Sequence, residues 1–365
     1  MKLQKLVKVI EEKYPVNLAY GWDNVGLLVG DLDIEIKKVL VSIEANDKLI
    51  EEAIEKDVDL IVTHHPFIFS KINRVTTSDY KGKLIHKLIK NDIAIYSTHT
   101  NFDIAFDGLN DYFMTLLGIE ESAILDVTYS EQLYKLAVYV PKDHVENVSD
   151  TICDAGAGYI GNYSHCTFNI DGNGTFMPQE GTDPFIGAIN ALERVEEIKV
   201  ETVVPQKILN NVLGEMLKSH PYEEVAYDLY KIENKGKSFG LGRVANLNEK
   251  ISLEELANLI KEKLKMKHIR VVGDLNTDIT RVAVVTGSGS SYVKDAKNKG
   301  AQVLITGDLK YHEAQDALDI GMTIIDCGHF ESEYIFKDIM KAFLVEKVDL
   351  EVIQSEVDLN PIKTI

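Results

Sequence analysis

The sequence predicts an α/β protein in which two α/β halves form one domain and enclose an inserted α+β domain. Two observations predict this class. Short apolar segments alternate with amphipathic segments at both ends of the chain, whereas the middle follows a different order with its own apolar periodicity. Continuous apolar strands that are separated by helices are typical of a sheet covered on both faces.

The two ends of the chain carry the same alternating pattern. In the first part, strands are predicted at 39–43, 60–63 and 93–98, and helices at 2–14, 47–57, 79–91 and 103–117. In the last part, strands are predicted at 282–287, 303–307, 322–326 and 350–353, and helices at 291–299, 311–320 and 329–345. Helices between consecutive strands predict parallel pairing with right-handed crossovers.

The middle of the chain predicts a separate domain. Between 133 and 230 the order is strand, helix, strands, helix, strand, which is the βαββαβ order of a ferredoxin-like unit. A stretch rich in Gly and Pro at 169–187 predicts a hairpin and a loop inside it. We therefore predict that 1–127 and 241–365 form the two halves of one domain and that 128–240 is the insert.

Composition limits the class of protein. Hydrophobic residues make up 45% and charged residues 27% of the 365 residues, as in soluble globular proteins. The sequence has neither the apolar core of a secretory leader nor a bilayer-length apolar run, so we expect a cytoplasmic protein without a membrane partner. The net charge of −19 makes nucleic acid an unexpected partner. Cys153, Cys166 and Cys327 lack C-x-x-C spacing, which argues against disulfides and a thiolate metal site.

Metal-capable residues follow four of the predicted strands. The segments are LIVT before HHP, IAIYST before HTNFD, VLITG before DLKYH and MTIID before CGHFESE. The carboxyl ends of parallel strands face one crevice, and open α/β sheets place their sites there. We therefore expect one site built from these four clusters.

His64 and His65 directly follow the strand at 60–63. Adjacent residues in an extended chain point to opposite sides, so we expect the two imidazoles to serve two neighbouring ions, one each. The alternative interpretation is a pair of surface histidines in a loop, because histidine is intermediate in its burial.

His329 and Glu333 are four residues apart at the start of a predicted helix, a spacing that puts both side chains on one face and suits metal ligands. A helix N-terminus also favours a carboxylate in its first turn, but Glu331 satisfies that preference equally well. Asp103 opens another predicted helix, where it can act as an N-cap, as a metal ligand or as both.

These candidates predict a centre with two divalent metal ions, since five protein ligands exceed the three that a catalytic zinc usually keeps. The predicted ligands are His64, His65, Asp103, His329 and Glu333. Mixed nitrogen and oxygen ligation without thiolate suits zinc, iron(II), manganese or cobalt. His99 is a candidate proton shuttle, and Asp308, His312 and Asp326 are candidates to support the ligands. The GSGSS segment at 287–291 suits either an anion site or an ordinary loop.

Five segments of the chain resemble the signature segments of the Nif-three-like dinuclear metal proteins, which are widely named type 2 GTP cyclohydrolase I homologues. They are GWDNVGLLVGD (21–31), THHP (63–66), STHTNFD (97–103), GDLKYHEA (307–314) and DCGHFESE (326–333). The resemblance covers roughly 1–125 and 240–365, and the middle resembles the insert of the longer bacterial members, which is similar to the P-II signalling and copper-tolerance protein fold. Glu44 departs from the aspartate of the family pattern.

The resemblance carries expectations about ligands, assembly and reaction. It implies the same five metal ligands and a toroidal homohexamer made from trimers, with the metal sites facing an internal cavity. It also implies a reaction in which the imidazole ring of GTP is opened by hydration at C8 and formate is released.

We therefore expect a metal-dependent hydrolase that acts on a nucleotide or a related small molecule, with metal-activated water as the nucleophile and His99 as acid and base. The alternatives are a metal-dependent phosphoesterase and a regulatory or scaffold protein that binds metal without turnover. A ferredoxin-like insert is compatible with the last alternative, because such domains often bind small ligands or form trimers.

Overall fold

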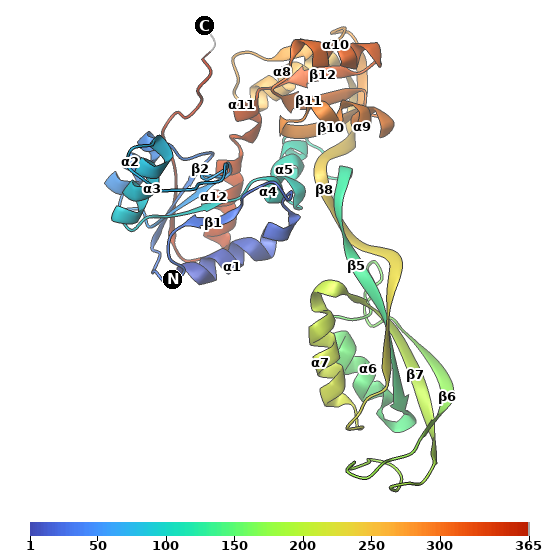
Figure 1. Cartoon of the computed structure of the whole chain (residues 1–365). Helices are drawn as coiled ribbons and strands as arrows, with labels where there is room; N and C mark the ends of the chain where they lie inside the picture. Colours follow the sequence, from blue (N-terminus) through green and yellow to red (C-terminus); the bar gives the residue numbers. More distant parts are fainter. Residues whose placement is uncertain (364–365) are drawn as a thin grey trace. The chain divides into compact units, whose positions relative to one another are not determined.

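The computed structural model describes residues 1–363, which form two sheets in a mixed α/β fold, as the sequence predicts. The chain divides into two compact units (Figure 1). Unit 1 contains residues 1–128 together with those from 239 onward, and unit 2 contains Tyr129–Ser238. Unit 1 is therefore discontinuous in sequence and joins both ends of the chain.

The first sheet of unit 1 has five strands. Their order is β1 (Gly26–Val29), β4 (Ala94–Ser97), β3 (Leu60–Thr63), β2 (Lys38–Ser42) and β13 (Glu351–Gln354). Neighbouring strands are parallel except for β1, which pairs antiparallel with β4. Strand β13 lies near the far end of the chain. It pairs with β2 and not with β12, the strand that comes directly before it in sequence.

Helices cover both faces of this sheet because successive strand residues point to opposite sides. Val39 and Val41 pack in one apolar cluster with α1 (Leu3–Lys13) and α12 (Phe336–Lys347). Leu40 packs in another with α2 (Asp47–Glu55) and α3 (Tyr80–Lys90), which lie on the opposite side of the sheet (Figure 1). Burial on both faces explains why the central strands are continuously apolar.

The second sheet has eight strands, and the five that follow β5 in its order lie wholly or partly in unit 1. Their order is β8 (Tyr227–Ser252), β10 (Asp278–Ser288), β11 (Val303–Gly307), β12 (Thr323–Asp326) and β9 (Arg270–Val272). Strands β10, β11 and β12 are parallel, and β8 and β9 are antiparallel to their neighbours. One face packs against α5 (Leu109–Leu116) and α8 (Leu253–Lys263), the other against α9 (Val293–Asn298) and α10 (Tyr311–Asp319).

Unit 2 has the order strand, helix, strand, strand, helix, strand. Its elements are β5 (Ala123–Pro141), α6 (Val145–Asp154), β6 (Thr167–Phe176), β7 (Glu193–Pro205), α7 (Leu209–Ser219) and β8. The sheet order is β6, β7, β5, β8. Both helices bury their apolar residues against the sheet in one cluster that includes Val138, Ile152, Val200 and Met216.

Two predicted helices are each divided in the structure. The prediction of one continuous helix at 103–117 is wrong, because α4 (Thr100–Ile104) ends before α5 begins. A Cβ at Gly108 would lie 1.9 Å from the Phe102 carbonyl oxygen, so the chain turns closely there and only glycine fits. The helix predicted at 329–345 consists of α11 (His329–Glu333) and α12.

Among the α-helices and strands, β1, β9 and α8 were not predicted from the sequence. Helix α8 begins with a capping box in which Ser252 and Glu255 bond each other's backbone amides, a signal that is visible in the sequence. Strands β1 and β9 are short edge strands whose pairing depends on distant neighbours. None of the helices within residues 1–363 has the length and apolar character of a membrane-spanning segment.

Candidate metal centre

Five side chains converge at the carboxyl ends of parallel strands in unit 1. His64 and His65 directly follow β3, Asp103 lies in α4 after β4, and His329 and Glu333 lie in α11 after β12. The strand ends are aligned, since Thr63 pairs with Ser97 and Thr306 with Asp326. The loops that leave these strands therefore start at similar heights along their sheets, as open α/β sites require.

Glu333 lies at the middle of this cluster. Its Oε2 is 2.8 Å from His65 Nε2 and 3.1 Å from His329 Nε2, and its Oε1 is 3.6 Å from His64 Nε2. His64 Nε2 is 3.8 Å from Asp103 Oδ1, and the Nε2 atoms of His65 and His329 are 3.3 Å apart. The structure thus brings together all five residues that the sequence singled out.

Several polar atoms in this cluster are buried without a partner. Within residues 1–363, no hydrogen bond is made by either ring nitrogen of His64 or by Asp103 Oδ1. His64 is fully buried, and Asp103 and Glu333 are 8% and 4% exposed. Burying a polar group without a hydrogen bond is unfavourable, so these atoms fit a role that other protein groups do not satisfy.

The distances between the donor atoms fit shared metal coordination. Two ligands that each lie about 2.1 Å from a tetrahedral ion are roughly 3.4 Å apart. A separation of 3.3 Å occurs here between two nitrogen donors, and separations of 3.6 and 3.8 Å occur between a nitrogen and an oxygen donor. The His and Glu groups can therefore hold a metal ion; His65, His329 and Glu333 form one such group, and His64, His65 and His99 form another.

Carboxylates lie beside the Nδ1 atoms of two histidines of the cluster and of His99, which adjoins it. His329 Nδ1 bonds Asp308 Oδ2 at 2.7 Å, His99 Nδ1 bonds Asp23 Oδ1 at 2.9 Å, and His65 Nδ1 lies 3.7 Å from Glu44 Oε2. A carboxylate in this place fixes the tautomer and the ring orientation, which leaves Nε2 directed to the cluster.

Burial and charge shift the pKa values in the cluster. Burial lowers the pKa of His64 to about 4, so its imidazole is neutral and can donate a lone pair. Burial, and then the charge of Glu333, raises the pKa of Asp103 well above its usual range. A divalent cation would reverse this effect, since it favours the charged carboxylate.

The pKa values of His65 and His329 are raised, in contrast to that of His64. Burial opposes the charged form of His65, but hydrogen bonds and charge from Glu333 and Glu44 raise its pKa to about 10. A hydrogen bond to Glu333 is the main cause that raises the pKa of His329 to about 9. A metal ion that binds these nitrogens must displace their protons, so metal binding at neutral pH releases protons.

Gly287 makes room for the central carboxylate. A Cβ at this position would lie 2.2 Å from Glu333 Oε1 and 3.6 Å from His329 Nε2. Its φ of +69° also lies in the left-handed region that glycine adopts without strain. The N–H of Gly287 donates to Oγ of Ser332 in α11 at 2.9 Å. The first glycine of the GSGSS segment therefore holds this helix in place.

Comparisons with known proteins identify the family. The family model of Duf34/NIF3 (NGG1p interacting factor 3) matches residues 1–361. The chain belongs to this family. The family resemblance found in the sequence is therefore confirmed.

Relatives of this DUF34/NIF3 chain match it along almost its whole length. A Bacillus subtilis (strain 168) protein named GTP cyclohydrolase 1 type 2 homolog is 43% identical over 363 residues, covering 98% of this chain and 97% of that protein. A protein of the same name from Halalkalibacterium halodurans is 45% identical over 363 residues, with the same coverage. The crystal structure of a Bacillus cereus protein related to NIF3 is 39% identical, covers 100% of this chain and 99% of that chain, and has a TM-score of 0.91.

In this DUF34/NIF3 chain, the alternative that Asp103 is an N-cap does not hold, because α4 begins at Thr100 and His99 occupies the cap position. His64 and His65 are not part of the extended strand, because β3 ends at Thr63 and the chain bends there. Their ring centroids are 5.3 Å apart, which lets both imidazoles reach the same cluster.

The three residues predicted to support the metal ligands differ in their contacts. Asp308 bonds the ligand candidate His329. Asp326 instead pairs with Arg270 and accepts from the backbone N–H groups of Gly328 and Leu309. His312 is exposed on α10, where its ring contacts Tyr311. Asp23 was missed, although the GWDN segment that contains it was part of the family resemblance.

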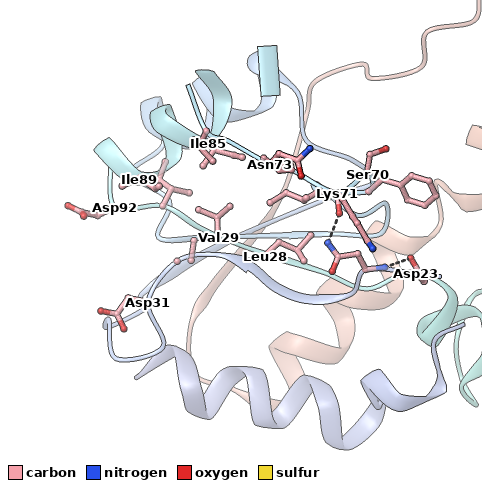
Figure 2. A pocket seen from close by; sticks show the side chains of 18 of the residues that line it. Asp23, Leu28, Val29, Asp31, Ser70, Lys71, Asn73, Ile85, Ile89 and Asp92 are labelled. Carbon is pink, nitrogen blue, oxygen red and sulfur yellow. Dashed lines mark hydrogen bonds between the residues drawn. The ribbon is translucent and has the colours of Figure 1, made fainter. Parts of the chain in front are cut away.

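An open pocket of about 1000 Å³ begins beside the cluster and is lined by Trp22, Asp23 and Phe69 among others. Figure 2 shows Asp23 near one end, with Asp31 and Asp92 at the other. Trp22 is 60% exposed and its ring lies 6.1 Å from that of His99 and 6.1 Å from that of Phe69. An exposed aromatic surface thus adjoins the candidate metal centre of this DUF34/NIF3 protein.

Proposed function

We propose that this protein is a dinuclear metal-dependent hydrolase that acts on a nucleotide-like substrate. The proposal depends on one observation: three imidazoles and the carboxylates of Asp103 and Glu333 meet in one cluster. The buried atoms of His64 and Asp103 that lack partners within residues 1–363 support it, because metal ligation would satisfy them.

Glu333 would contribute to the binding of both ions, because its two oxygens face different histidines. Its Oε2 faces His65 and His329, which are the proposed ligands of one ion. Its Oε1 faces His64, which lies beside Asp103, and these two are the proposed ligands of the other. Two divalent ions held there would supply Lewis acidity and would lower the pKa of water, which makes hydroxide accessible near neutral pH.

The donor set favours zinc or iron, with manganese and cobalt as further candidates. Thiolate is not part of this set. Cys327 lies near α11, but its Sγ donates to the Thr306 carbonyl oxygen at 3.2 Å. Burial raises the pKa of its thiol far above the usual range, so it stays protonated and does not compete for the ion.

We propose His99 as the group that moves a proton during hydrolysis. Asp23 holds its Nδ1 and also accepts from the backbone N–H and the hydroxyl of Thr100. Burial works against the Asp23 carboxylate, but its hydrogen bonds with His99 and Thr100 lower its pKa below the usual value. An ionised Asp23 therefore orients His99 and leaves Nε2 to accept or donate the proton.

The substrate class is inferred from the surface beside the centre. Trp22 stacks on Tyr20 at 5.7 Å, which holds its ring in place while most of it stays exposed. A fixed, exposed aromatic ring next to a hydrolytic centre suits a planar heterocycle such as a nucleobase. The names of the relatives point to GTP, whose imidazole ring opens when water adds at C8 and whose further hydrolysis releases formate.

The direct test is turnover by the metal-loaded protein. We expect formate from GTP, and we expect His65→Ala and Glu333→Ala to abolish it while circular dichroism shows a retained fold. Orthophosphate or nucleoside monophosphate as the product would instead establish phosphoester cleavage. If none of a broad nucleotide and phosphoester panel is turned over, and ligands only change the assembly, the hydrolase proposal is wrong and a regulatory role replaces it.

We further propose that residues 128–240 are a ferredoxin-like insert and that the chain assembles as a homohexamer. The strand order β6, β7, β5, β8 and the packing of α6 and α7 on one apolar cluster support the first proposal. The second proposal comes from the family resemblance. Light scattering coupled to size-exclusion chromatography tests it, and a stable monomer or dimer would contradict it.

A further inference from the structure

Unit 2 contains a cavity of about 450 Å³ that the proposed hydrolysis does not use. Its walls come from β5 and β7, from the end of β6 with the loop that follows it, and from the segment after α7. Phe176, Phe185, Glu197 and Tyr222 are among the lining residues. Its size is in the range of pockets that hold small organic molecules.

Three aromatic rings of this cavity are inclined to one another. The ring centroids of Phe176 and Tyr222 are 5.8 Å apart with an angle of 60° between their planes. Those of Phe185 and Tyr222 are 6.3 Å apart at 51°. Inclined rings surround a ligand from several sides instead of stacking on a flat one, and such cages bind organic cations through the negative faces of the rings.

The charge of the lining has the sign that a cation requires. Glu197, Glu223 and Glu224 contribute carboxylates, and no lysine, arginine or histidine is among the described residues that line the cavity. Glu197 is only 9% exposed. Its Oε1 accepts a hydrogen bond from the Tyr222 hydroxyl at 3.0 Å, which is a neutral partner, and no cationic side chain of residues 1–363 forms an ion pair with it.

The direction of that hydrogen bond is determined by the phenol. Burial, followed by the hydrogen bond to Glu197, raises the pKa of Tyr222 above its usual range. The phenol therefore stays protonated and donates its hydrogen to Glu197 Oε1.

Two backbone features adapt the chain to this arrangement. A Cβ at Gly174 would lie 2.1 Å from Glu197 Oε2, so the glycine leaves the space that the carboxylate occupies. In the loop after β6, the backbone N–H of Asp183 donates to Glu223 at 3.1 and 3.2 Å to its two oxygens. The loop is thereby tied to the opposite wall of the cavity.

We propose that this pocket of unit 2 binds a small organic cation that carries an alkylated ammonium group. The rings of Phe176, Phe185 and Tyr222 surround the ammonium group, and Glu197 supplies the compensating charge. The cavity is larger than choline, which makes choline a minimal probe of the ammonium subsite. This proposal is independent of the proposed hydrolysis, because none of its residues belongs to the metal cluster.

The test compares choline with its neutral carbon analogue 3,3-dimethylbutan-1-ol, which has the same shape, by titration calorimetry on the full-length protein. We expect choline to bind at least about fivefold more tightly, since the difference isolates the cationic charge. Equal affinities, or no binding of choline at millimolar concentration, would overturn the proposal.

Matched variants locate the site. Phe185→Leu and Glu197→Gln should each weaken choline binding about tenfold, and Gly174→Ala should weaken it because the carboxylate must move. Glu196→Gln, on the same strand but outside the lining, and Tyr163→Leu, an exposed aromatic outside it, should change affinity by less than about twofold. Circular dichroism checks folding. If Phe185→Leu alters the oligomeric mass and leaves choline affinity unchanged, the pocket is a contact surface and the proposal is wrong.

Discussion

Single histidines of the cluster differ in what their two ring nitrogens contact. The Nδ1 atoms of His99 and His329 bond carboxylates, whereas no nitrogen of His64 has a hydrogen-bond partner within residues 1–363. Together with full burial, this pattern fits the proposed role of His64 as a metal ligand, because an ion would satisfy its nitrogen. His99 is partly exposed and is already held by Asp23, which suits a proton carrier.

The first prediction separates these two roles. We expect His99→Gln to keep its metal content and to lower kcat by about 10²- to 10⁴-fold, because only proton transfer is lost. His64→Ala should lose metal as well as activity. Elemental analysis and steady-state kinetics on both variants measure this. Loss of metal from His99→Gln would instead make His99 a ligand, as its place in a group with His64 and His65 allows.

The second prediction uses two glycines with similar backbone conformation. Gly287 has φ +69° and Gly321 has φ +72°, so an alanine at either position is strained by about 1 kcal/mol. Only at Gly287 would the added Cβ meet Glu333, because nothing lies within 4 Å of the Cβ position at Gly321. We expect Gly287→Ala to reduce metal stoichiometry and Gly321→Ala to retain it, as measured by elemental analysis. Equal metal content would contradict the central role of Glu333.

At the scale of elements, short helices position the site. Helices α4 and α11 each have five residues and precede a longer helix that packs in the core. The break between α11 and α12 lets His329 and Glu333 face the cluster while Phe336 packs in the core. Apolar periodicity predicted both pairs as continuous helices, because it responds to the average pattern and not to the close contact at Gly108.

Helix α2 also fastens the segment that follows β13. Glu52, which is 8% exposed, accepts from the Ser355 hydroxyl, the Glu356 backbone N–H and the Lys56 ammonium. Burial alone would raise its pKa, but these hydrogen bonds lower it below the ordinary value of 4.5. A carboxylate whose pKa is lower in the folded than in the unfolded protein stabilises the fold at pH values above its unfolded-state pKa. This stabilisation is lost as the pH falls through its folded-state pKa.

The third prediction follows from that sign. Glu52→Gln should lower the free energy of unfolding by about 1–3 kcal/mol at pH 7, and the difference from wild type should shrink as the pH falls below about 4.5. Urea titrations at a series of pH values measure it. Glu55→Gln, an exposed glutamate on the same helix, is the control and should have little effect. A difference that persists unchanged at low pH would refute the assignment.

At the scale of the whole molecule, the cluster joins distant parts of the chain. His65 and Glu333 are 268 positions apart and come from the two segments that together form unit 1. A ligand that binds only the folded state stabilises it by mass action, about 2.7 kcal/mol at a free concentration of 100 times Kd. Ions in this cluster should therefore stabilise unit 1 as a whole.

The fourth prediction is that chelation lowers the Tm of the metal-loaded protein by several degrees. Scanning calorimetry with and without a chelator measures the change. His65→Ala should start near the Tm of the chelated protein and respond little to chelator. A wild-type Tm that is insensitive to chelation, in protein with two ions per chain, would show that the ions do not stabilise the fold.

The sequence by itself determined the family, the mixed α/β class and the metal-capable residues at the strand ends. Periodicity and residue chemistry are local properties, so β3 at Leu60–Thr63 and α10 at Tyr311–Asp319 could be recognised without coordinates. Only the tertiary structure decided that β13 pairs with β2, that Asp23 holds His99, and that Gly287 makes room for Glu333. These contacts join residues far apart in the chain, and no local pattern specifies which distant atom will fill a given space.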